Sequence, residues 1–224
     1  MKINESNELN GLNDLNELNK LNGLNDFQMT LITDARDNIV HGLCVSNLTY
    51  LIAMQMGLDE DICYDLSVAG ILHDIGKLQL SRYLYGRAEE SFQMEGMKYM
   101  RMHSKMSYDI LQYYDLSPFI LQSVLYHHEN YNGSGYPENL KGEDIPFGAR
   151  ILRVADTFCA LVSDRPYRKA FDVDTAMEIM IDEIGNYDME VFLAFQRVIH
   201  EQGAIERIQS GKSLMGIENV FDIE

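Results

Sequence analysis

Apolar residues recur at helical spacing along most of the chain from residue 28 onward. No comparable series of alternating apolar and polar residues indicates strands. The pattern therefore predicts an all-α fold, and Asp59 is a suitable N-cap for the second of its helices. We expect helices at residues 28–56, 59–73, 92–114, 117–128, 146–163, 173–184 and 188–202.

Three stretches depart from this pattern. Gly and Pro cluster at 132–148, which predicts an ordered loop. Residues 4–27 form a triplet repeat of the type Asn-x-Leu, whose period of 3 residues fits neither an α-helix nor a coiled coil. We expect a low-complexity, disordered or weakly helical tail over 1–27, with a partner-binding helix as the alternative. A folded domain is predicted for 28–205, and a C-terminal extension of uncertain structure for 206–224.

Length and charge narrow the class of protein. A chain of 224 residues suggests one domain, or one domain with a tail. The net charge of -17 argues against a binder of nucleic-acid polymers, because these proteins grip phosphates with clustered Lys and Arg. A small phosphate ligand stays compatible with this charge, since bound metals and a few local cations can reverse the field in one pocket.

The three cysteines, Cys44, Cys63 and Cys159, lie in apolar contexts and form no CxxC pattern. Reduced thiols in a cytoplasmic protein are therefore expected, not a disulfide framework or a zinc knot. No apolar run reaches the roughly 18 residues of a membrane span. The N-terminus also lacks the apolar core of a signal peptide. We expect a cytoplasmic protein without a membrane span.

The pair His73-Asp74 closes an apolar helical run and is followed by Gly76-Lys77. At a helix end an adjacent imidazole and carboxylate can converge on one divalent metal. Lys77 follows Asp74 by 3 residues, so the two can share a helix face. Lys77 then suits a phosphate drawn to the metal, although a charge favoured by the helix dipole is the alternative.

Further candidate ligands follow or interrupt other apolar runs. Taken alone, each histidine is compatible with an ordinary hydrogen-bonded role, but consecutive histidines at a helix end are hard to explain as packing. A carboxylate after a buried run is costly unless it is paired or metal-bound. Mixed nitrogen and oxygen ligands suit Fe or Mn, and two close metals can generate a bridging hydroxide and stabilise a phosphodiester in hydrolysis. These candidates are His41, His103, His127, His128 and Asp156.

Two segments offer groups for a phosphate ligand. Arg165 and Arg168 can present guanidinium forks to phosphate, although an exposed basic turn is the alternative. Tyr136 lies in the Gly-rich loop that follows His127-His128, which suggests a pocket wall, with an ordinary turn as the alternative.

The chain resembles the HD-GYP family over about residues 37–200. The match comprises ordered motifs: His73-Asp74-Ile75-Gly76-Lys77, His103, His127-His128-Glu129, Gly133-Ser134-Gly135-Tyr136-Pro137, Val154-Ala155-Asp156 and Arg165-Pro166-Tyr167-Arg168. The resemblance implies an all-α, HD-domain helical bundle with an ordered Gly-Tyr-Pro loop. It also implies a bacterial signalling phosphodiesterase that hydrolyses cyclic di-GMP to pGpG and, with a second cleavage, to GMP.

The resemblance carries roles over to particular residues. It implies two or three divalent metals, with Asp74 bridging two of them, and Lys77 at the scissile phosphate. Arg165 and Arg168 would hold phosphate, and Tyr136 would line the pocket. Asp37, one helical turn before His41, stands where some members have a glutamate ligand, so it is a candidate for a third metal. The implied metal ligands are His41, His73, Asp74, His103, His127, His128 and Asp156.

The sequence departs from the family pattern at four positions, namely Asn132, Ser104, Ser107 and Cys159. None of them removes an implied ligand, but they can alter the loop or the hydrogen bonds around the metals. Two alternatives to an active cyclic di-GMP phosphodiesterase therefore stay open. One is a catalytically weak module that binds a cyclic dinucleotide and signals through a homodimer or a protein partner. The other is a phosphodiesterase for another cyclic dinucleotide.

Overall fold

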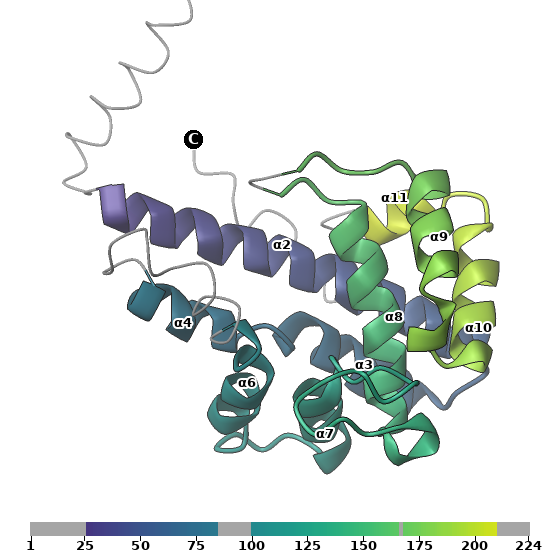
Figure 1. Ribbon diagram of the computed structural model, residues 1–224, viewed down its shortest axis with the longest axis horizontal. Coiled ribbons are helices and arrows are strands. Elements are labelled where there is room, and N and C mark those ends of the chain that lie inside the picture. Colours follow the sequence, from purple (N-terminus) through teal and green to yellow (C-terminus); the bar gives the residue numbers. More distant parts are fainter. Residues whose placement is uncertain (1–25, 85–99, 166–167, 210–224) are drawn as a thin grey trace, which may run out of the picture.

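The computed structural model describes residues 26–84, 100–165 and 168–209, and within these ranges the chain is helical (Figure 1). The described part contains no strand beyond an isolated bridge between Arg165 and Arg168. The helices are α2 (Asp26–Gln55), α3 (Glu60–Leu72), α4 (Gly76–Leu84), α6 (His103–Leu111), α7 (Pro118–Tyr126), α8 (Phe147–Leu161), α9 (Val173–Asp182), α10 (Met189–Ile199) and α11 (Ala204–Gln209), with short 3-10 turns at Gly142–Asp144 and Ile184–Asn186.

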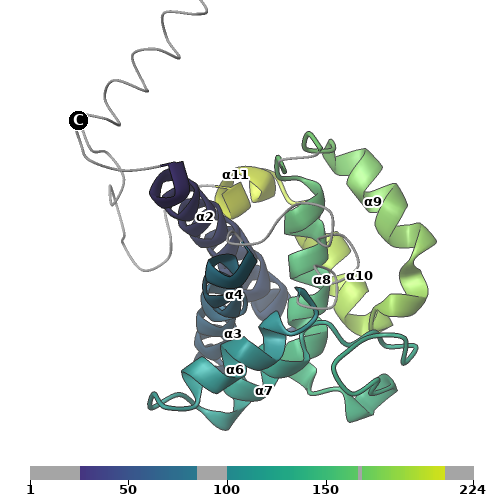
Figure 2. The same cartoon turned by 60° about the vertical axis from the view of Figure 1, so that its left-hand side comes forward.

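The long helix α2 runs along the bundle, and the other helices lie in two groups beside it. Helices α3, α4, α6 and α7 form one group, while α9, α10 and α11 gather at the far end of α2 (Figures 1 and 2). Helix α8 stands between the groups and contacts α2, α7 and α10. It therefore links both halves of the described bundle. None of the described helices is long and apolar enough to cross a membrane.

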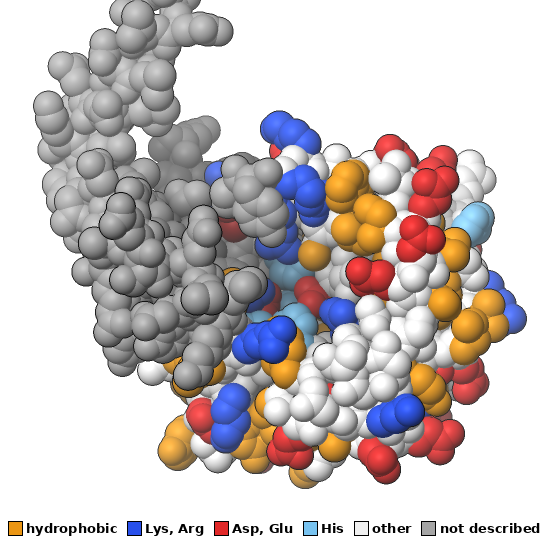
Figure 3. Space-filling view, in the orientation of Figure 1, with side chains coloured by type: hydrophobic (Ala, Val, Ile, Leu, Met, Phe, Trp, Pro, Cys, Tyr) orange, Lys and Arg blue, Asp and Glu red, His pale blue; other side chains and the backbone are white. Residues whose placement is uncertain are grey.

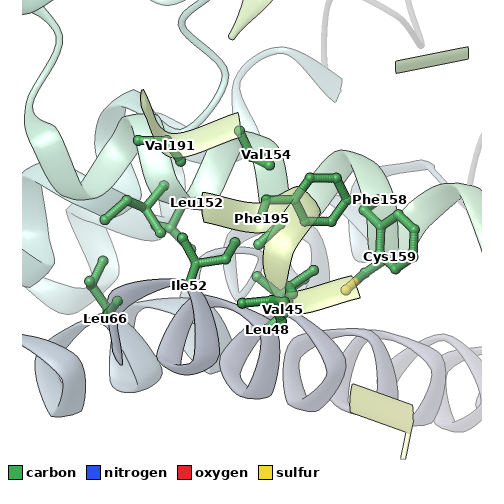
Figure 4. Close-up of a cluster of buried hydrophobic side chains, with 14 of the residues drawn as sticks. Val45, Leu48, Ile52, Leu66, Leu152, Val154, Phe158, Cys159, Val191 and Phe195 are labelled. Carbon is green, nitrogen blue, oxygen red and sulfur yellow. The ribbon is translucent and has the colours of Figure 1, made fainter. Parts of the chain in front are cut away.

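The hydrophobic core lies where α2, α3, α8 and α10 meet (Figure 4). Phe158 of α8 and Phe195 of α10 are fully buried and pack edge to face, with ring centroids 5.1 Å apart. Leu48 of α2 and Leu66 of α3 close the cluster from the other side. Burying each such side chain contributes roughly 1.5–3 kcal/mol, so this core fixes α2 against α8.

Glycines allow α2 and α3 to approach closely. A Cβ at Gly42 would lie 2.8 Å from the Ile71 carbonyl oxygen, and a Cβ at Gly70 would lie 2.7 Å from the Ser46 Cα. Both contacts are too short for any side chain, so the backbones pack directly against each other. The close approach brings His41, beside Gly42, next to the C-terminal end of α3.

The predicted all-α fold is confirmed, and six of the expected helices match α2, α3, α7, α8, α9 and α10 within a few residues. The expected helix at 92–114 is described only from residue 100, as α6. Asp59 has an extended backbone before α3, but its side chain makes no capping bond. Ser117, Asp172 and Asp188 do cap α7, α9 and α10, each through a side-chain oxygen that accepts backbone N–H bonds.

Two described helices were not predicted. Helix α4 begins at Gly76, directly after the turn that holds His73 and Asp74. Helix α11 crosses the expected domain limit at residue 205, and Asn47 of α2 donates hydrogen bonds to its Arg207 and Ile208 carbonyls. The triplet repeat falls outside the described residues except for its last two, and the segment from residue 211 lies wholly outside them. The expected domain boundaries stay predictions.

Candidate metal centre and phosphate pocket

The predicted metal ligands come together from five regions of the chain. His41 projects from α2, His73 and Asp74 occupy the turn after α3, and His103 begins α6. His127 and His128 follow the last residue of α7, and Asp156 lies on α8. Within the part of the chain that the structure describes, they form three overlapping groups with ligand atoms within 4.8 Å of one another: His103, His127 and His128; His41, His73 and Asp74; and His73, His127 and Asp156.

Distances within and between these groups suit shared cations. The His41 Nε2 lies 2.9 Å from the Asp156 Oδ1, and the His73 Nε2 lies 3.2 Å from the Asp74 Oδ2. On the other side of Asp74, its Oδ1 lies 3.2 Å from the His103 Nε2. Asp74 thus faces candidate ligands on both sides, and its role as a bridge between two metals stays a prediction.

Three of the rings are oriented by backbone carbonyls. The His73 Nδ1 donates to the Gly70 carbonyl and the His127 Nδ1 to the Val124 carbonyl, each at 2.7 Å. The His103 Nδ1 bonds in the same way to the Met100 carbonyl. A bond at Nδ1 turns the Nε2 lone pair toward the centre of the cluster, which is the usual arrangement of metal-binding histidines.

The buried polar atoms of the cluster are better satisfied by divalent metals than by hydrogen bonds to one another. The His73 Nε2 and the Asp74 Oδ1 are buried without a hydrogen bond. The His103 Nε2 lies 3.0 Å from the His128 Nε2 and 3.3 Å from the His127 Nε2. Three ring nitrogens that face one another cannot all be satisfied by their own protons. A cation among them would satisfy them, so the donor set fits the implied metals.

Burial and charge determine the protonation of the cluster. Burial disfavours a charged His73 ring, yet the nearby Asp74 and Asp156 carboxylates raise its pKa to about 10. Burial lowers the pKa of His128 to about 3 and that of His127 well below its usual value. The metal-free cluster therefore balances its carboxylates with a proton on His73. A bound metal would replace this proton, which couples metal affinity to pH.

Contacts between α4 and α6 position Asp74 against His103. A Cβ at Gly76 would lie 2.4 Å from the His103 carbonyl oxygen, so only glycine allows this approach. The Gly76 N–H donates to the Ser107 hydroxyl at 2.9 Å. Ser107, one of the departures from the family pattern, thus helps to hold the two helices together, and Ser104 is fully buried beside it.

The open side of the centre is basic. Figure 3 shows a hollow in which histidine and acidic side chains are surrounded by Lys and Arg side chains. The Lys77 Nζ donates to the Asp74 Oδ2 at 2.5 Å. The Tyr136 ring stacks on the His128 ring at 4.7 Å, and the Arg101 guanidinium lies 5.6 Å from the Tyr136 ring centroid. Lys77 and Tyr136 therefore lie beside the candidate ligands, and their contacts with a substrate stay predictions.

The two predicted phosphate-binding arginines differ in their surroundings. The Arg168 guanidinium donates to the carbonyls of Ala160, Leu161 and Lys169 and lies 4.4 Å from the Phe171 ring centroid. It therefore caps the C-terminal end of α8. Arg165 is partly exposed, and its charge acts on the Cys159 thiol of the same helix. Phosphate binding by either residue stays a prediction.

Asp37 and the remaining departures lie at the edge of the centre. Asp37 is exposed on α2, and it belongs to none of the possible metal-binding groups found among the described residues. The Asn132 side chain accepts from the Ser134 N–H and donates to the Asn186 Oδ1. An aspartate would keep the first bond and lose the second. Cys159 is fully buried in the core beside α2.

Sequence reasoning missed two arginines of the pocket. Arg101 reaches the Tyr136 ring, and Arg153 lies on α8, one turn before Asp156. The spacing of Arg153 from Asp156 is the signal that could have identified it, since residues 3 apart share a helix face. For Arg101 only the tertiary structure reveals the contact.

The family model of the HD domain matches residues 15–191, most of the chain. The chain belongs to the HD domain family. Its relatives and motifs are of the HD-GYP type, as the sequence predicted. The match begins inside the triplet repeat and covers every candidate ligand.

Relatives of this HD domain include several phosphodiesterases. A cyclic di-GMP phosphodiesterase of Pseudomonas aeruginosa is 31% identical over 77% of this chain and 42% of its own length. A 3'3'-cGAMP-specific phosphodiesterase of Vibrio cholerae is 34% identical over 71% of this chain and 35% of its own length. The chain thus spans less than half the length of these curated relatives.

Solved structures confirm the HD fold. A cyclic GMP-AMP phosphodiesterase of V. cholerae, V-cGAP3, matches with a TM-score of 0.60 at 18% identity, over 77% of this chain and 46% of that one. An HDG"Y"P protein from Bdellovibrio bacteriovorus matches with a TM-score of 0.57 at 19% identity, over 74% of this chain and 54% of that one.

Proposed function

We propose that the protein is a metal-dependent phosphodiesterase that hydrolyses cyclic di-GMP to pGpG and, by a second cleavage, to GMP. The convergence of five histidines and two aspartates below a basic rim is the observation that carries this proposal. Relatives named as cyclic di-GMP phosphodiesterases support the substrate class. An origin in a bacterium and action in the cytoplasm, as expected from the sequence, belong to the same proposal.

Two or three divalent metals, Fe or Mn, would be held by the seven implied ligands, with Asp37 as the candidate ligand of the third. When bound, they would supply Lewis acidity toward a phosphodiester and toward water. The donor set supports Fe or Mn because it mixes imidazole with carboxylate and lacks thiolate.

Residues of the chain would orient the phosphodiester over this centre. The Lys77 Nζ donates to the Asp74 Oδ2 at 2.5 Å, so its positive charge lies beside the implied ligands. From this position it would attract and contact the scissile phosphate. Arg165 and Arg168 would add positive charge at the rim, and Tyr136 would form the wall next to His128. Because six of the seven implied ligands are buried, this polar chemistry would take place with little competition from bulk water.

The test is hydrolysis of cyclic di-GMP by protein purified and loaded with Fe or Mn under anaerobic conditions. Chromatography should detect pGpG first and GMP later. His73→Gln should abolish turnover, while His200→Gln should leave it unchanged, because His200 is exposed at the end of α10 and belongs to none of the possible metal-binding groups among the described residues. Absence of cleavage by protein with a verified metal content would overturn the proposal.

A second candidate is a phosphodiesterase for another cyclic dinucleotide. The similarity of the chain to cGAMP-specific phosphodiesterases of V. cholerae favours this candidate. A panel of cyclic di-GMP, 3'3'-cGAMP and cyclic di-AMP at equal concentrations separates the two functions, because the preferred substrate has the highest kcat/KM.

A further inference from the structure

Arg153 lies on α8 near the candidate metal ligands, although it is neither one of them nor part of the motifs quoted above. It is half-buried on α8, one turn before Asp156. Its Nε donates to the Asn130 Oδ1 at 2.9 Å, and its Nη1 donates to the Thr157 Oγ1 at 3.1 Å. These two bonds fix the guanidinium between α8 and the loop that follows His128.

The fixed guanidinium keeps donors for a ligand. An arginine has five N–H donors, and the described contacts use one on Nε and one on Nη1. Among the described residues, Nη2 has no hydrogen-bond partner. The Arg153 charge also lowers the pKa of His128 and acts on the Tyr136 phenol, which indicates that it is close to the metal centre and the Gly-Tyr-Pro loop.

A cyclic dinucleotide carries two phosphates, and the metal centre engages only one of them during cleavage. The second needs a cation held a short distance away. The guanidinium of Arg168 already donates to the carbonyls of Ala160, Leu161 and Lys169. Arg153 instead combines a fixed position with an unused donor edge, the arrangement with which arginine binds phosphate at low entropic cost.

We propose that Arg153 is a specificity-determining residue that binds the phosphate of the cyclic dinucleotide that is not being cleaved. This role rests on the proposed phosphodiesterase function. It predicts that Arg153 contributes to binding of substrates with two phosphates and not to cleavage of a phosphodiester as such.

The experiment compares two substrates with the manganese-loaded full chain. Cyclic di-GMP has two phosphates, and bis(p-nitrophenyl) phosphate has one. Arg153→Gln should raise the KM for cyclic di-GMP about tenfold to a hundredfold, with kcat changed less than about twofold. The rate with bis(p-nitrophenyl) phosphate should not change. Arg153→Lys should give an intermediate KM for cyclic di-GMP, because lysine keeps the charge but lacks the paired N–H donors of the guanidinium.

Two controls isolate the effect. Arg197→Gln removes the same charge from an exposed position on α10 and should change neither substrate. Thr157→Val keeps Arg153 but removes the Thr157 hydroxyl that accepts from its Nη1, so it should give a smaller rise in KM. Fluorescence anisotropy with labelled cyclic di-GMP measures affinity independently of turnover, and the thermal unfolding midpoint verifies that each variant is folded.

Failure of this role differs from failure of the function. If the wild type turns over cyclic di-GMP and Arg153→Gln leaves its KM unchanged, the role of Arg153 is overturned and the proposed function is not. An equal loss of activity on both substrates would have the same meaning. The wild type could also bind cyclic di-GMP without turnover. In that case an affinity, measured by anisotropy, that Arg153→Gln leaves unchanged would overturn the role of Arg153, and a weaker affinity would support it. Neither binding nor turnover of any cyclic dinucleotide by the metal-loaded wild type would overturn the proposed function and the role with it.

Discussion

Replacing Gly76 with alanine is expected to separate α4 from α6 and to disturb the metal centre. The new Cβ would lie 2.4 Å from the His103 carbonyl oxygen and 2.7 Å from the Ser107 nitrogen. An ordinary contact begins at 3.4 Å, so the nearer atom must move by 3.4 − 2.4 = 1.0 Å. Both atoms are backbone atoms, so no rotation of a side chain relieves the overlap.

The expected losses of stability and of rate follow from this displacement. Overpacking of this kind costs about 1–3 kcal/mol of stability. At about 2–4 °C per kcal/mol for a chain of this size, the thermal unfolding midpoint should fall by about 2–12 °C. Because His103 and Asp74 flank the contact, a misplacement of about 1 Å should also lower the rate with cyclic di-GMP by about a hundredfold.

Differential scanning fluorimetry and turnover of the manganese-loaded protein measure the two effects. Gly185→Ala is the matched control, because the nearest atom to a Cβ there is 3.8 Å away. Ser107→Ala removes the hydroxyl that accepts from the Gly76 N–H without adding bulk, and should cost about 1–3 kcal/mol. If Gly76→Ala behaved like Gly185→Ala in both assays, the close approach of α4 and α6 would not position the centre.

Three further predictions concern pH, the loop and the core. His73, with a raised pKa of about 10, stabilises the metal-free protein below pH 6.5 and loses this effect as pH rises through about 10. His128, with a lowered pKa of about 3, destabilises the metal-free protein as pH falls below 6.5. Urea unfolding should therefore show the greatest free energy of unfolding near pH 6.5. A free energy that rises steadily from acid to alkaline pH would contradict these two pKa shifts. Glu129→Ala leaves the Glu138 N–H without its acceptor, so urea unfolding should show a loss of about 1–3 kcal/mol that Glu143→Ala, at an exposed site, does not cause. Phe158→Ala should cost about 3–5 kcal/mol by the same measurement, because its ring is fully buried, and a loss below 1 kcal/mol would argue against the core described above.

The sequence predicted the helices and the ligands because both depend on local chemistry. Apolar periodicity marks the buried face of α8, and a carboxylate such as Asp156 at the end of that run needs a partner wherever the chain folds. The position of each ligand relative to the others depends on tertiary packing. The glycine contacts that bring α2 to α3 and α4 to α6 have no signature in a single sequence.

The same limit explains what sequence reasoning missed. The missing side chain of Gly76 allows α4 to begin in contact with α6, and the motif around Gly76 does not reveal this contact. The Arg168 guanidinium donates to carbonyls at the C-terminal end of α8. This orientation depends on the position of that helix end, which the sequence around Arg168 does not reveal. Arg101 meets Tyr136 only because α6 and the Gly-Tyr-Pro loop fold together.

The proposed function requires that the cluster around Asp74 binds the metals with which the protein acts as a phosphodiesterase. Its most direct test is a titration of metal-free protein with Mn under anaerobic conditions, with bound metal and cyclic di-GMP turnover measured on the same samples. We predict that turnover appears as about two or three ions bind per chain, and that Asp74→Asn prevents both binding and turnover. Full turnover without bound metal, or metal binding that Asp74→Asn leaves intact, would contradict this requirement.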